Sequence, residues 1–138
     1  MKIRAFTKLR TLGISALMSV LPAALLAGPA QAAANPYTPQ GVCGSGYTVQ
    51  RSHALSGAVV YQLYNGSYNC VVTIKTTQVG TPTRTTAGLQ TSGSSWAYDT
   101  GDYKYYAGPV KQYGKGKCVR FFGYHGGTSY TSPWGNCG

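Results

Sequence analysis

The feature that most constrains the fold is a pair of strand-like segments joined by Asn65-Gly66. Ala58–Tyr64 is rich in β-branched and aromatic residues, and Tyr68–Thr76 follows the dipeptide. Asn and Gly tolerate positive φ, so this pattern is the strongest hairpin signal in the chain. The second segment alternates between two faces: Cys70, Val72 and Ile74 on one, and Val71, Thr73 and Lys75 on the other. Cys70 therefore points with an apolar set, as expected for a disulfide in a core.

Turn signals recur about every ten residues along the rest of the chain. We interpret Asp99–Asp102 as a turn, and Gly108-Pro109 as a break that cannot lie in the middle of a sheet. No segment after the leader shows a helical period. The sequence predicts an all-β domain, a small antiparallel sandwich or barrel of seven or eight strands. The remaining strand-like segments are Tyr47–His53, Thr83–Thr91, Trp96–Tyr98, Tyr103–Ala107, Val110–Tyr113 and Lys117–Phe122.

The first 32 residues have the pattern of a helical secretory signal peptide. A basic segment is followed by the apolar run Leu12–Leu26 and then by Ala30-Gln31-Ala32. The run is short for a membrane anchor and contains polar residues and a proline. We place cleavage after Ala32 or just before Asn35. Residues 33–138 then form a single secreted β domain, with no membrane attachment after cleavage.

Residues 33–42 contain two prolines, which argue against a helix. We expect an extended N-terminal arm, fixed at Cys43. The four cysteines are Cys43, Cys70, Cys118 and Cys137, all after the leader. An even number in a small exported chain indicates disulfides. Of three possible pairings we favour Cys43–Cys70 with Cys118–Cys137, because each closes a compact local loop.

The charge balance of the exported part is basic. The leader contains four of the 12 Lys and Arg residues, so eight remain against two acids, a formal charge of +6. A basic surface suits an anionic partner among cell-wall or spore-surface polymers or proteins. It is also what keeps many secreted proteins soluble. Nothing indicates a specific nucleic-acid partner.

Few residues could support catalysis. There is no Glu, and the only acids are Asp99 and Asp102, so paired-carboxylate chemistry has one candidate pair. His53 and His125 could form a ribonuclease-type pair with a nearby lysine, but neither lies in a recognisable motif, and His125 falls in a glycine-rich, loop-like stretch. With the cysteines in disulfides, no metal cluster remains. We predict no catalytic residue, no cofactor and no metal.

The strongest compositional signal is the 12 tyrosines, all after the leader. Exposed aromatic rings favour contact with sugars or proteins, although tyrosine is also an ordinary strand residue. The most basic and aromatic stretch is Gly101–Phe122. Within it we predict a contact face that comprises Tyr103, Lys104, Tyr105, Tyr106, Lys111, Tyr113, Lys115 and Lys117. Arg120 shares a strand face with Cys118, so an inward Cys118 would point Arg120 inward too, unless a bulge at Gly116 intervenes.

Several stretches resemble the spore-associated protein A family of small secreted actinobacterial proteins. They are Asn35-Pro36-Tyr37-Thr38, Val42–Tyr47, Tyr68–Thr73, Tyr103–Val110, Gly116–Val119 and Tyr130–Pro133. The resemblance covers the whole exported part and implies a protein found at the spore or aerial-cell surface. It implies no catalytic residues.

We therefore expect a non-enzymatic, extracellular protein of the spore or cell envelope, which acts by adhesion or coating through a Tyr- and Lys-rich face. One alternative is a small secreted inhibitor of a hydrolase. Another is a small basic secreted nuclease.

Overall fold

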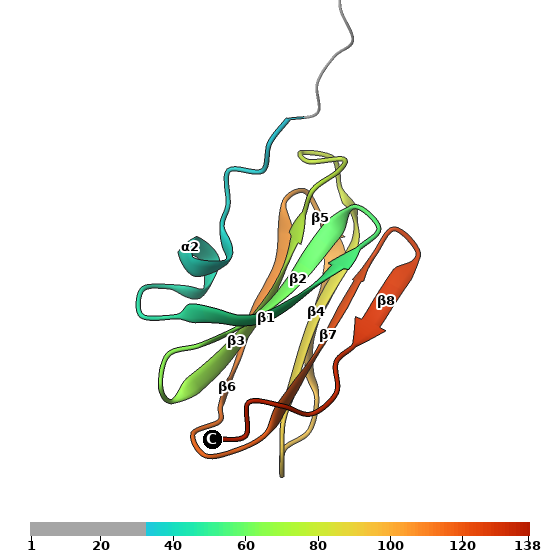
Figure 1. Cartoon of the computed structure of the whole chain (residues 1–138). Helices are drawn as coiled ribbons and strands as arrows, with labels where there is room; N and C mark the ends of the chain where they lie inside the picture. The colour runs from blue at the N-terminus through green and yellow to red at the C-terminus, as the bar shows by residue number, and fades with distance from the viewer. Residues whose placement is uncertain (1–32) are drawn as a thin grey trace, which may run out of the picture. The chain divides into compact units, whose positions relative to one another are not determined.

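The computed structural model describes residues 33–138 (Figure 1), so the predicted signal peptide lies outside the described residues. Eight strands form two four-stranded antiparallel sheets, with the order β1-β2-β3-β6 in sheet A and β5-β4-β7-β8 in sheet B. The predicted antiparallel sandwich is confirmed. The elements are α2 (Pro39–Cys43), β1 (Thr48–Leu55), β2 (Ala58–Tyr64), β3 (Tyr68–Lys75), β4 (Thr83–Thr91), β5 (Ala97–Tyr103), β6 (Tyr106–Tyr113), β7 (Val119–His125) and β8 (Thr128–Thr131).

The hairpin around Asn65-Gly66 joins β2 and β3 as predicted. The Asn65 side chain helps to close it, because its Oδ1 accepts hydrogen bonds from the backbone N–H groups of Ser67 and Tyr68, at 3.0 and 2.7 Å. Gly66 has a φ of +101°, which explains the choice of glycine there. This hairpin supplies the two central strands of sheet A.

The main core lies between the two sheets and is almost entirely aliphatic. It comprises Val60, Val71, Ala87, Leu89, Ala107, Val110, Val119 and Phe121, all with 8% or less of their surface exposed. Gly123 of β7 also faces this core: a Cβ built on it would lie 2.6 Å from Cβ of Val60. The two sheets therefore approach closely at that point.

A second apolar cluster covers the outer face of sheet A. It comprises Cys43, Tyr47, Leu63, Cys70, Val72 and Ile74, so both faces of β3 are buried. The disulfides link Cys43 to Cys70 and Cys118 to Cys137, which are the pairs favoured from the sequence. The first of them joins the N-terminal segment to the centre of sheet A.

The expected extended arm over residues 33–42 is wrong in its last part, because α2 begins at Pro39. Proline is tolerated in the first turn of a helix, where its missing N–H would have no partner. The Thr38 side chain caps the helix by accepting a hydrogen bond from the Gly41 N–H at 3.0 Å. One turn of helix is what brings Val42 and Cys43 down onto the sheet.

Two further expectations, which concern Asp99–Asp102 and Gly108-Pro109, differ from the structure. Asp99–Asp102 is not a turn but part of β5, an edge strand where polar side chains can remain outside the core. Gly108-Pro109 does not break the strand but lies within β6, beside a register irregularity between Val71 and Thr73; β6 is an edge strand of sheet A, so the proline is not in the middle of a sheet. Proline is compatible with a sheet at edges and bulges, since no ladder hydrogen bond is lost there.

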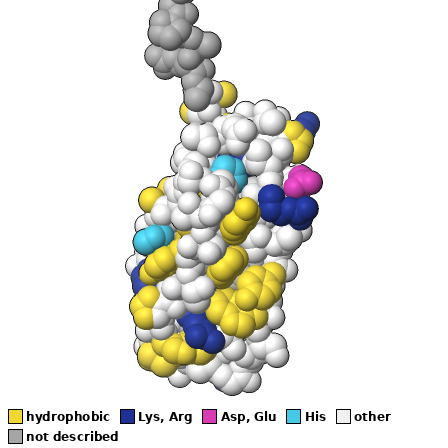
Figure 2. Space-filling model, turned by 90° about the vertical axis from the view of Figure 1, so that its right-hand side faces the viewer, with side chains coloured by type: hydrophobic (Ala, Val, Ile, Leu, Met, Phe, Trp, Pro, Cys, Tyr) yellow, Lys and Arg dark blue, Asp and Glu magenta, His cyan; other side chains and the backbone are white. Residues whose placement is uncertain are grey.

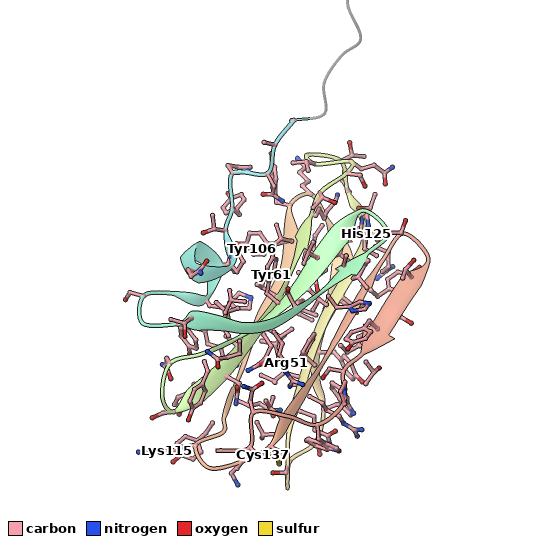
Figure 3. The ribbon with its side chains drawn as sticks, viewed as in Figure 1. Arg51, Tyr61, Tyr106, Lys115, His125 and Cys137 are labelled. Atoms are coloured by element: carbon pink, nitrogen blue, oxygen red, sulfur yellow. A yellow bond between two sulfur atoms is a disulfide. The ribbon has the colours of Figure 1, made fainter. Side chains whose placement is uncertain are left out.

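The C-terminal tail, where no strand was predicted, forms β8 and then pairs Gly135 with Val119. Arg51 of β1 holds this segment: its guanidinium donates to the carbonyl oxygens of Pro133 and Val119 at 3.0 and 2.9 Å (Figure 3). Within residues 33–138, no helix is long and apolar enough to span a bilayer.

Candidate functional sites

The eight residues of the predicted contact face are spread along β6 and the turns before and after it. Tyr103, Lys104, Tyr105 and Tyr106 lie around the turn between β5 and β6, whereas Lys115 and Lys117 lie in the turn between β6 and β7. Figure 3 shows Tyr106 beside the N-terminal segment and Lys115 at the opposite end of the sandwich, near Cys137. β6 runs between the two groups.

Lys111 and Tyr113 of β6 lie on the outer face of sheet A, between these two groups. The Lys111 ammonium is 5.0 Å from the centroid of the Tyr47 ring, and Tyr113 meets Tyr68 edge to face at 5.6 Å. Tyr68 and Tyr113 are 45% and 50% exposed. They form an exposed aromatic pair on sheet A.

The first group forms a tyrosine pocket of about 350 Å³, lined by Tyr37, Tyr103, Lys104, Tyr105, Tyr106 and Gly108. The Tyr37 ring closes one side, with its centroid 5.4 Å from that of Tyr105 and 5.0 Å from that of Tyr106. Asn35 holds the N-terminal segment, and with it Tyr37, against this turn, because its amide donates to the carbonyl oxygens of Lys75 and Tyr105 at 2.9 and 2.8 Å. The sequence thus predicted four of the six lining residues but missed the part played by the N-terminal segment.

Tyr103 and Asp99 form a hydrogen-bonded pair at the base of this turn. The Tyr103 hydroxyl donates to Asp99, whose other oxygen accepts from the Gly108 N–H at 2.7 Å. The bond to the carboxylate raises the pKa of Tyr103, and burial adds to the effect. Asp99 is therefore engaged in holding β5 to β6. The other acid, Asp102, forms an exposed ion pair with Arg84 at 3.3 Å.

Lys75 is fully buried next to the same turn. Its ammonium donates to three backbone carbonyl oxygens, those of Gln78 and Tyr103 at 2.9 and 3.0 Å and that of Thr81. Burial lowers the pKa of Lys75. The lysine joins the loop after β3 to the end of β5.

Another group of aromatic side chains, which the sequence analysis did not single out, lies on the outer face of sheet B. The register places Gly88 of β4 between Tyr98 of β5 and Phe122 of β7. Because Gly88 has no side chain, the Tyr98 ring lies over the strand: a Cβ on Gly88 would be 2.6 Å from Cδ1 of that ring. Tyr98 and Phe122 meet edge to face at 5.8 Å and 88°.

Both tryptophans of the chain extend this group. Trp96 stacks on Tyr98 with 5.3 Å between centroids and 11° between planes. Trp134 comes from the segment after β8, and the Arg120 guanidinium lies 4.5 Å from its centroid and 5.2 Å from that of Trp96. We call Trp96, Tyr98, Arg120, Phe122 and Trp134 the sheet B platform. Figure 2 views the molecule from the β8 side and shows hydrophobic side chains gathered over its lower half, with basic side chains among and beside them.

Arg120 points outward, which resolves its orientation. β7 begins at Val119, after Cys118, and its buried positions are Val119, Phe121, Gly123 and His125. Arg120 therefore alternates with the core residues. Its Nε donates to Oε1 of Gln90 at 2.8 Å, and the Gln90 amide in turn donates to the Ser94 carbonyl at 2.9 Å. No inward charge and no bulge at Gly116 is needed.

The two histidines have different surroundings. His125 ends β7 rather than lying in a loop, and it is 2% exposed. Its Nδ1 bonds the Ser56 carbonyl oxygen at 2.7 Å, and its Nε2 bonds the Thr83 hydroxyl at 3.0 Å. His53 is exposed and stacks on Tyr130 at 3.6 Å. In the described part of the chain, no three His, Cys, Asp or Glu residues cluster as metal ligands would.

Together, the fold and these surfaces define a small, disulfide-linked antiparallel β-sandwich with an exposed aromatic face. The chain is 44% identical over 103 residues to spore-associated protein A of Streptomyces coelicolor, and the match covers 71% of this chain. The chain therefore belongs to the spore-associated protein A family, which confirms the resemblance noted in the sequence. It spans 66% of that relative's length. No family model matches the chain, and no solved structure matches it.

Proposed function

We propose that this protein is a non-enzymatic component of the spore or cell envelope, which adheres to an envelope polysaccharide through the sheet B platform. The observation that carries the proposal is the stacked pair Trp96 and Tyr98 on a flat sheet face, with Tyr98 55% and Trp134 42% exposed. Exposed aromatic faces of this kind suit the apolar faces of sugar rings, whereas a core would bury them.

The location rests on other observations. The relative is named for its association with spores, and two disulfides are typical of proteins outside the cytoplasm. The signal-like leader agrees with export. The partners that we propose are accordingly cell-wall or spore-surface polymers, with the tyrosine pocket as a second contact.

The absence of an enzymatic activity is part of the proposal. Both imidazole nitrogens of His125 are engaged by Ser56 and Thr83, and Asp99 is bound by Tyr103 and Gly108. These contacts leave few groups for acid–base chemistry near either aromatic surface.

A sedimentation assay with insoluble envelope polysaccharide tests the proposal. The variant Trp96→Ala with Tyr98→Ala removes the stacked pair, and we expect at least a tenfold loss of affinity, about 1.4 kcal/mol. Tyr68→Ala with Tyr113→Ala is the matched control, because it removes an exposed aromatic pair from sheet A. Equal losses in the two variants, with both folds intact by circular dichroism, would assign adhesion to general aromatic content and refute the site.

A further inference from the structure

We propose that the polysaccharide bound by the sheet B platform is acidic, and that Arg120 recognises a carboxylate on one of its sugar rings. This inference rests on the proposed function and specifies the ligand of the same site. It starts from the way in which the Arg120 side chain is held.

The plane and position of the Arg120 guanidinium are fixed from several sides. Two tryptophan rings lie within 5.2 Å of its Cζ, and its Nε is bonded to Gln90. Gln90 is itself oriented by the Ser94 carbonyl. A long flexible side chain is thereby held in one arrangement before any ligand arrives, which reduces the entropy lost on binding.

The terminal nitrogens of this guanidinium have no bonded acceptor among residues 33–138. Arg51, by contrast, donates both of its terminal nitrogens to backbone carbonyls. The two acids of the chain are committed elsewhere, Asp99 to Tyr103 and Asp102 to Arg84. Arg120 therefore presents paired N–H donors at the surface, the arrangement that binds a carboxylate or phosphate through two parallel hydrogen bonds.

The surroundings favour a carboxylate attached directly to a sugar ring. The Arg120 Cζ is 4.5 and 5.2 Å from the two tryptophan centroids, so an anion bound to Arg120 would lie beside a sugar ring in contact with either tryptophan. A hexuronic acid carries its carboxylate on the pyranose ring and meets this requirement. A polyol phosphate has no ring to stack on Trp96. The formal charge of +6 on residues 33–138 also favours a polyanion.

Polygalacturonic acid and its fully methyl-esterified form are the probes, because they share one backbone and differ in charge. Affinity is measured for the protein without its leader in 150 mM salt, where long-range attraction is screened. We expect the acid to bind at least tenfold more tightly than the ester. Arg120→Gln should remove that difference, so that the acid and the ester bind about equally. Arg120→Lys should restore only part of it, since an ammonium lacks the planar pair of donors.

Lys115→Gln is the matched control for charge, because it removes one exposed positive charge at the end of the sandwich. An equal loss in Lys115→Gln and Arg120→Gln would show non-specific attraction and overturn the inference. Tighter binding of a glycerol-phosphate polymer than of polygalacturonate would overturn it in favour of phosphate. The wild type could also bind the acid and the ester equally while Trp96→Ala with Tyr98→Ala abolishes binding of both. That result would leave the proposed function intact and refute only the role of Arg120. Binding that the double variant does not weaken would refute the proposed function itself.

Discussion

Gly88 and Gly123 lie on neighbouring strands of sheet B but face opposite sides of it, so the same substitution at each position tests which face is core. In register, Gly88 is opposite Phe122, and Gly123 is opposite Ala87. Neither glycine has a positive φ, so backbone strain does not enter. The difference between the alanine variants reports on packing alone.

At Gly123 the added methyl group meets a rigid neighbour. Its Cβ would lie 2.6, 2.9 and 3.0 Å from Cβ, Cγ1 and Cγ2 of Val60, which is fully buried and β-branched. The sheets must separate locally, and overpacking of this kind costs about 1–3 kcal/mol. At Gly88 the close atoms are Cδ1 and Cε1 of Tyr98, at 2.6 and 2.7 Å, and Cβ of Phe122, at 3.1 Å, which needs to give by only a few tenths of an ångström. Tyr98 is 55% exposed and can swing into solvent, so Gly88→Ala should cost under about 1 kcal/mol.

Urea titration followed by far-UV circular dichroism measures both values. We expect Gly123→Ala to lower the midpoint by about 1 M and Gly88→Ala by much less, while Gly88→Ala alone changes tryptophan fluorescence through the Trp96–Tyr98 stack. Equal destabilisation by the two variants would mean that the sheet B platform is packed as a core, which would contradict its assignment as a binding face.

Two more predictions concern the turn between β5 and β6. Lys75→Met should destabilise the fold by about 2–4 kcal/mol, because three carbonyl oxygens lose a charged donor; a urea midpoint unchanged from the wild type would show that these carbonyls find other partners. Tyr103 has a raised pKa in the folded state, so its contribution is complete below pH 10 and is lost as the pH rises through the folded pKa. Tyr103→Phe should therefore be less stable than the wild type at pH 8, with a smaller difference at pH 10.5, and a difference that does not change with pH would exclude this linkage.

The sequence was sufficient for those parts of the fold that local signals determine. The bounds of β2 and β4 follow from β-branched runs that end at Asn65-Gly66 and Ser92-Gly93, and the disulfide pairs follow from loop closure. Asp99–Asp102 was misassigned because aspartate favours turns when its side chain hydrogen-bonds the nearby backbone, and here the two carboxylates have other partners. In the structure Tyr103, Gly108 and Arg84 supply such partners.

The binding surfaces were less predictable, because they depend on which strands become neighbours. Trp96-x-Tyr98 and Arg120-x-Phe122 each show a period of two, the signal of a shared face. Nothing local indicates that β5 and β7 flank the same strand at Gly88, or that the tail brings Trp134 to Arg120.

The chain covers the outer faces of the two sheets to different extents, and this difference supports the proposal that sheet B carries the binding face. The outer face of sheet A is covered around Cys70 by α2 and Tyr47, and the Cys43–Cys70 disulfide holds that cover in place, whereas Tyr68 and Tyr113 remain exposed. Chain entropy assigns a loop of 27 residues a stabilisation of about 3–4 kcal/mol. On the outer face of sheet B, the tail segment places the Trp134 ring centroid 4.5 Å from the Arg120 guanidinium, while Tyr98 is 55% exposed. A small domain gains stability from each apolar face that it covers, so aromatic rings left exposed on sheet B argue for a ligand that covers them.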